Sequence, residues 1–158
     1  MPDVKPRQEA APEATVPLTP DEEAVVRSLS RVIYALPRAL DTDMVREQRL
    51  PLIEYLALMY LSEVPERQMR MSDLARACEL SVSGMTRVVH RLENEGLVQR
   101  VKCTQDARGW NAVLTDAGLA RLREAWRTNL SSVRRHFLDH LEGLDLKALG
   151  AALKNVAT

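Results

Sequence analysis

The chain has 158 residues, with 22 basic and 22 acidic side chains and a formal net charge of zero. This length fits a single domain with a sizeable core. The two cysteines exclude a disulfide framework, their spacing matches no zinc pattern, and no apolar run reaches the ~18–20 residues of a membrane span. The N-terminus lacks the apolar core of a secretion signal. We therefore expect a cytoplasmic protein without metal, cofactor or membrane contact.

Positive charge collects in the middle of the chain. Residues 1–66 carry seven Lys or Arg and twelve Asp or Glu, whereas residues 67–108 carry eight and five. The middle segment therefore attracts an anionic partner such as nucleic acid, while the N-terminal part repels one.

The N-terminal part predicts a tail and one long helix. Residues 1–18, rich in Pro, Ala and charge, are expected to be disordered. Thr19-Pro20-Asp21-Glu22 predicts a helix start, with a capping box between Thr19 and Glu22. Pro37 predicts a kink. An apolar stripe carries the helix to about residue 42 through Val26, Leu29, Ile33, Leu36 and Leu40.

Four shorter elements follow. A second helix is predicted over residues 51–62, because its apolar side chains follow a helical period and Val64-Pro65 ends it. Residues 69–71 predict a short strand, and Ser72 is expected to cap a short helix to Cys78. Ser81 is expected to cap the next helix, which Gly96 ends. Its core-facing stripe is formed by Met85, Val88, Val89 and Leu92.

The C-terminal half predicts two strands and two helices. Residues 97–103 and 111–114 have strand composition, with a polar loop between them. Thr115-Asp116 begins a long helix whose apolar stripe continues to residue 141, so that one helix of ~40 Å is expected. Gly143 separates it from a short final helix.

The outer face of the helix that Ser81 caps carries small, polar and basic residues. Hydroxyls and free N–H groups in a first helical turn suit phosphate, and Gly84 permits a close approach. Thr86 suits base edges, and Arg87 and Arg91 suit guanine or phosphate. In the loop between the strands, Arg108 can enter a minor groove while Asp106 holds it. The candidate DNA-binding residues are Ser81, Ser83, Gly84, Thr86, Arg87, His90, Arg91, Asp106 and Arg108.

These segments resemble the MarR family of bacterial winged helix-turn-helix transcriptional regulators. Asp106-Ala107-Arg108, followed by Leu114-Thr115 before a long helix, looks like the wing of that family. Ser81-x-Ser83-Gly84-x-Thr86-Arg87, continuing to Gly96-Leu97-Val98, is similar to its recognition helix and exit. The resemblance covers roughly residues 22–157. It implies a mainly α (α+β) fold, a winged helix-turn-helix with N- and C-terminal dimerisation helices.

The resemblance also implies how the chain is organised and what it does. It divides the chain into a tail (1–18), an N-terminal dimerisation region (19–48), a DNA-binding domain (49–115) and C-terminal dimerisation helices (116–158). A homodimer would bind a pseudo-palindromic double-stranded operator, with two recognition helices in successive major grooves. We expect a repressor that responds to a small aromatic or phenolic effector, held by Tyr34, Arg38, Tyr55 and Met59 with Arg38 as the carboxylate partner.

Other functions are less well supported by the residues. A winged-helix module for protein–protein contact would not need the basic outer face. An enzyme is not expected, because the three histidines have no nucleophile partner in a known pattern and no phosphate-binding glycine loop exists. Related peroxide sensors place a cysteine in the first helix, where residues 20–42 have none, but redox activity of Cys78 or Cys103 stays open. His136 and His140 have metal-ligand spacing, yet a surface or dimer-interface role is favoured.

Overall fold

The computed structural model describes residues 16–103 and 109–156. Most of the predicted tail, and both Asp106 and Arg108, lie outside these ranges. Two compact units are present, one up to Ile33 and one from Tyr34 onward, and the long helix α1 (Pro20–Gln48) contributes to both. No helix among the described residues is long and apolar enough to cross a bilayer.

The first unit contains the start of α1, and the predicted capping box is confirmed there. The Thr19 backbone N–H donates to Glu22 Oε2 at 2.7 Å, and the Glu22 N–H donates to Thr19 Oγ1 at 3.3 Å. The hydrogen bond from Thr19 lowers the pKa of Glu22. Beyond the cap, the apolar side chains of this part of the helix are exposed, namely Val25, Val26, Leu29, Val32 and Ile33.

The end of α1 corrects the prediction that the helix stops near residue 42. The helix continues as one element through Pro37 to Gln48, and Arg49 follows with a φ of 52°. The apolar stripe ended earlier because the last turns are held by polar contacts as well as by the buried Met44. Asp43, the other buried residue of α1, contacts α5 (Asp116–His136) and has no apolar signal in the sequence.

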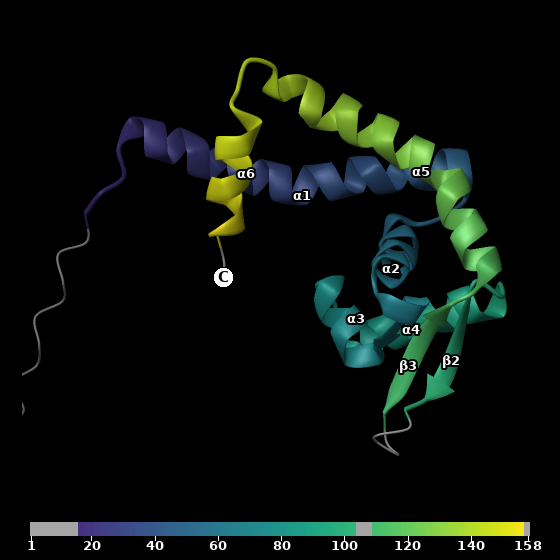
Figure 1. Cartoon of the computed structure of the whole chain (residues 1–158). Coiled ribbons are helices and arrows are strands. Elements are labelled where there is room, and N and C mark those ends of the chain that lie inside the picture. Colours follow the sequence, from purple (N-terminus) through teal and green to yellow (C-terminus); the bar gives the residue numbers. More distant parts are fainter. Residues whose placement is uncertain (1–15, 104–108, 157–158) are drawn as a thin grey trace, which may run out of the picture. The chain divides into compact units, whose positions relative to one another are not determined.

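A small three-stranded sheet, three α-helices and one 3₁₀ helix (η1) follow. The elements are α2 (Leu52–Glu63), η1 (Pro65–Arg67), β1 (Gln68–Arg70), α3 (Met71–Ala77), α4 (Val82–Asn94), β2 (Val98–Lys102) and β3 (Trp110–Leu114). The strands are antiparallel in the order β1-β3-β2, with Val98 opposite Leu114 and Arg70 opposite Asn111. In Figure 1, β2 and β3 run side by side beyond the helices. The mainly helical winged helix-turn-helix fold is thus confirmed.

One core joins these elements. Apolar side chains from α2, α3, α4 and β2 are almost completely buried in it: Leu58, Leu61, Leu74, Met85, Val89, Leu92 and Val98. The predicted cap by Ser72 is wrong, because α3 begins one residue earlier, after Arg70, and no side chain caps it. Gly96 does end the α4 segment with a φ of 71°, as expected.

The C-terminal helices also differ from the prediction. α5 ends at His136, Phe137 breaks the helix with φ −139° and ψ −65°, and the short η2 (Leu138–Leu141) precedes α6 (Leu146–Lys154). The apolar spacing did not reveal this break, because a 3₁₀ turn places side chains at nearly the same intervals as an α-helix.

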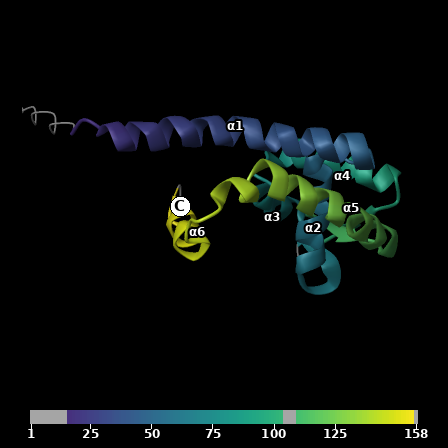
Figure 2. The ribbon, with the colours of Figure 1, turned by 90° about the horizontal axis from the view of Figure 1, so that it is seen from above.

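Polar contacts fix the end of α1 to α5. The buried Asp43 carboxylate accepts from Ser132 Oγ at 2.7 Å, and His136 Nε2 lies 2.9 Å from it. The Ser132 hydrogen bond, supported by His136 and by the positive charge of Arg46, holds the pKa of Asp43 below its ordinary value against the opposing effect of burial. His136 therefore has a partner within the chain. Figure 2 shows the end of α1 beside α5.

Three further hydrogen bonds to α5 are formed by Gln48, the last residue of α1. The Gln48 side chain donates to Thr128 Oγ1 at 2.8 Å. Arg121 donates both to the Gln48 side-chain oxygen at 3.1 Å and to its backbone carbonyl. This carbonyl would otherwise lack an intrahelical partner, so α5 caps α1.

Candidate nucleic-acid interface

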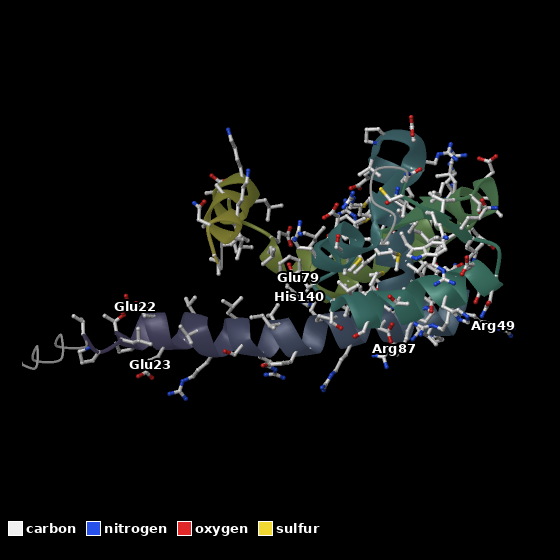
Figure 3. All side chains as sticks on the ribbon, turned by 90° about the horizontal axis from the view of Figure 1, so that it is seen from below. Glu22, Glu23, Arg49, Glu79, Arg87 and His140 are labelled. Carbon is white, nitrogen blue, oxygen red and sulfur yellow. The ribbon has the colours of Figure 1, made fainter. Side chains whose placement is uncertain are left out.

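The recognition-helix candidate α4 has one buried and one exposed face, as its sequence predicts. Its apolar stripe is buried, while Ser81, Ser83, Thr86, Arg87, His90 and Arg91 are exposed and Gly84 is half-buried. Figure 3 shows the Arg87 side chain at the outer surface. The candidate DNA-binding residues of α4 and its N-cap therefore lie on the face of the helix that is open to solvent, with Gly84 partly covered.

The first turn of α4 is held by its own hydroxyl groups. Ser81 is the N-cap: its Oγ accepts from the Gly84 backbone N–H at 3.1 Å and lies 3.1 Å from Ser83 Oγ. Thr86 Oγ1 donates its hydrogen to the Val82 carbonyl at 2.8 Å. The Thr86 side chain can therefore offer a ligand a hydrogen-bond acceptor and a methyl group. The remaining free N–H groups and the positive end of the helix dipole favour an anion here.

The two arginines of this face have different surroundings. Arg87 forms no ion pair with any described residue. Arg91 donates from Nε to Glu54 Oε1 at 2.5 Å, and Glu54, on α2, is 3% exposed. His90 is exposed, with Nδ1 3.3 Å from the Asn94 side-chain amide.

The base of the wing carries basic residues that sequence reasoning missed. Arg100 pairs with Glu93 of α4 at 2.8 Å, and both Arg100 and Lys102 lie within 6 Å of the centre of the Trp110 ring, at 5.8 and 5.9 Å. Their spacing of two along a strand was the available signal, because it places both on one face. A cavity of about 310 Å³ between this base and the start of α4 is lined by Arg70, Val82, Thr86, Arg100 and Trp110 among others.

The tip of the wing lies outside the described residues. Lys102 and Trp110 are paired at the ends of β2 and β3, so the loop that contains Asp106 and Arg108 joins these two positions. The roles predicted for Asp106 and Arg108 stay predictions.

The four candidate effector residues have unequal exposure. Tyr34 is 70% exposed and Arg38 is exposed on α1. Tyr55 is 2% exposed in the core, where burial raises the pKa of its hydroxyl, and Met59 is half-buried against the core. Tyr55 can reach a ligand only if the core around it opens.

The two cysteines also differ. Cys78 is buried, as predicted, and burial raises the pKa of its thiol to about 11, which keeps it protonated and unreactive. Cys103 is partly exposed and accepts a contact from Arg70 Nη2 at 3.5 Å. The described residues contain no cluster of three or more His, Cys, Asp or Glu side chains that could hold a metal ion.

Comparison with known proteins relates this arrangement to a family. Residues 50–109 match the MarR family model. The crystal structure of AbsC, a MarR family transcriptional regulator from Streptomyces coelicolor, is 40% identical, with 90% of this chain and 96% of that chain covered and a TM-score of 0.79. Sco3205, a MarR family regulator from the same organism solved in complex with DNA, is 34% identical, with 90% of each chain covered and a TM-score of 0.81.

A more distant structure shares the fold. A mutant of MarR from E. coli, complexed with operator DNA, is 18% identical, with 85% of this chain and 94% of that chain covered and a TM-score of 0.71. The comparison with curated proteins found no match. On the similarity to AbsC and Sco3205, the chain belongs to the MarR family of DNA-binding transcriptional regulators, which are not enzymes.

Proposed function

We propose that this protein is a homodimeric, ligand-responsive repressor that binds a pseudo-palindromic DNA operator through α4. The observation that carries the proposal is the exposed face of α4, where small hydroxyl residues at the helix start are followed by Arg87, which pairs with no described acid. Such a face can approach base edges closely and offers a guanidinium to guanine or phosphate. Sco3205, which is 34% identical, was solved bound to DNA.

Dimerisation is supported by uncovered apolar side chains near both ends of the chain. In α1, Val25, Val26 and Ile33 are more than half exposed, and near the C-terminus Leu146 and Val156 are 52% and 55% exposed. Apolar surface of this kind, exposed near both ends of the chain, is typical of an interface. We assign residues 19–48 and 116–158 to dimerisation and residues 49–115 to DNA binding.

The effector is proposed to act between these regions. The Asp43 and Gln48 contacts couple the end of α1 to α5, so a ligand that moves one helix would move the other. Arg38, exposed on α1, can pair with the carboxylate of an aromatic or phenolic acid, with Tyr34, Met59 and, after local opening, Tyr55 around the ring. Such a ligand would reduce the population of dimers whose two recognition helices have the spacing that DNA binding requires.

The experiment that tests the proposal is selection of bound duplexes from a random library with the purified protein. We expect an inverted repeat whose half-sites lie about one helical turn apart. Arg87→Ala should relax base preference at one position in each half-site by about 1–3 kcal/mol. Sedimentation should give a dimer at micromolar concentration. A monomer, or selected duplexes without a common sequence, would contradict the proposal.

The effector needs a separate measurement. Benzoate and salicylate, titrated into the complex of protein and selected duplex, are expected to release DNA from the parent but not from Arg38→Ala. Equal release from both proteins would exclude Arg38 as the carboxylate partner.

A further inference from the structure

Glu54 is a buried acid on α2, outside the recognition-helix candidate α4, and the proposed function gives it no role so far. It lies in the first turn of α2, is 3% exposed, and is followed by the core residue Tyr55. A carboxylate taken out of water is costly unless a charged hydrogen-bond donor satisfies it. The donor is Arg91 of α4, whose Nε lies 2.5 Å from Glu54 Oε1.

The pair uses only one edge of the Arg91 guanidinium. Nε donates to Glu54, whereas the terminal nitrogens contact no described acceptor, and the Arg91 side chain remains 51% exposed. A guanidinium is planar and rigid, so fixing Nε also fixes the direction of the terminal N–H groups. Arg91 lies one helical turn after Arg87, on the exposed face of α4.

We propose that Glu54 is a positioning residue for DNA recognition: its buried carboxylate holds Arg91 by Nε and directs the terminal N–H groups of Arg91 at the DNA. This inference rests on the proposed DNA surface of α4. In this inference Glu54, a residue of α2, affects the affinity for DNA without contacting the DNA itself. An arginine held in advance loses less conformational freedom on binding than a free one.

Whether removal of the Glu54 carboxylate weakens or tightens DNA binding distinguishes a positioning role from simple repulsion of phosphate. An acid near DNA repels phosphate, so removing a carboxylate with no other task should tighten binding. Removing a carboxylate that positions Arg91 should weaken it. Glu95 provides the matched control, because it is an exposed acid at the C-cap of the same helix and forms no ion pair with a described residue.

The test measures the affinity of variants for the duplex that the parent selects from a random library. Glu54→Met, similar in length and without charge, should bind roughly 2- to 100-fold more weakly, the range for contacting residues that are energetically coupled. Glu54→Gln, which retains an acceptor oxygen, should lose less. Glu95→Gln should bind as tightly as the parent or more tightly.

Two further variants exclude a purely structural role for Glu54. In the Arg91→Ala background, Glu54→Met should cause no additional loss, since the residue it positions is absent. Arg91→Lys keeps the charge but lacks the planar Nε–H, so it should weaken binding while the dependence of affinity on salt stays as in the parent. If Glu54→Met does not fold, Arg91→Lys and Glu54→Gln are the variants that test the proposal.

The outcomes distinguish failure of this inference from failure of the proposed function. If Arg91→Ala weakens binding while the Glu54 variants bind like Glu95→Gln, Glu54 does not position Arg91 and the DNA surface stands. The same conclusion follows if the losses from Glu54→Met and Arg91→Ala add. If Arg87→Ala and Arg91→Ala both bind like the parent, the proposed DNA surface of α4 is itself wrong.

Discussion

Substitution of Gly118 by alanine should destabilise the protein, although alanine is the better helix former. Gly118 lies in the first turn of α5, which follows the wing directly. A Cβ at this position would lie 2.1 Å from the Leu97 carbonyl oxygen and 2.6 Å from Leu114 Cδ1. The first distance is about 1 Å below any tolerable contact, so α5 or the segment before β2 must move.

The size of the expected loss of stability depends on the contacts that a movement of α5 away from Leu97 would weaken. The Leu97 carbonyl accepts from the Thr115 backbone N–H at 3.1 Å and from Thr115 Oγ1 at 3.0 Å. Inserting a methyl group into a packed site costs about 1–3 kcal/mol, and each weakened hydrogen bond adds about 0.5–1.5 kcal/mol. Alanine returns at most about 1 kcal/mol of helix propensity. We expect a net loss of about 1–5 kcal/mol in the free energy of unfolding.

The assay is urea unfolding followed by circular dichroism. All variants are measured at one protein concentration, because the proposed dimerisation would make stability depend on concentration. Gly150→Ala is the control: Gly150 also lies inside a helix, α6, and a Cβ there meets nothing within 4 Å. It should stabilise the protein by up to about 1 kcal/mol. If Gly118→Ala unfolds within about 0.5 kcal/mol of the parent, the close approach of α5 to Leu97 is not present in solution.

Three more outcomes are expected. Ser81→Ala, which removes the cap of α4, should lower the free energy of unfolding by about 1 kcal/mol in urea titrations, and Ser81→Asn should restore most of it. The pKa of Asp43 is lowered in the fold, so the ionised carboxylate stabilises the protein at pH values above 3.8, the ordinary pKa of the group, and this stabilisation is lost as the pH falls below that pKa. Asp43→Asn should therefore be less stable than the parent at pH 7, and the difference in the free energy of unfolding should become smaller below about pH 4 in unfolding titrations. A difference that does not change with pH would contradict this role of Asp43. Arg108→Ala should weaken binding to an A·T-flanked operator in gel retardation without changing the melting temperature, and unchanged retardation would remove Arg108 from the proposed site.

The sequence predicted the elements whose cause is local. The capping box of Thr19 and Glu22, the cap by Ser81 and the left-handed Gly96 all depend on residues within a few positions, and each was confirmed. The division of α4 into faces was also predictable, because an apolar period of about 3.6 leaves the other residues exposed.

Tertiary contacts decided the rest. Glu54 meets Arg91 across 37 residues and Asp43 meets Ser132 across 89, so no local pattern marks either acid as buried. The same holds for the extension of α1 to Gln48 and for the break at Phe137. Periodicity reports which face of a helix is apolar, whereas a buried polar partner is chosen by the packing of distant elements. The face of α4 proposed to meet DNA was therefore visible in the sequence, whereas the contact of Glu54 with Arg91 on that face was visible only in the fold.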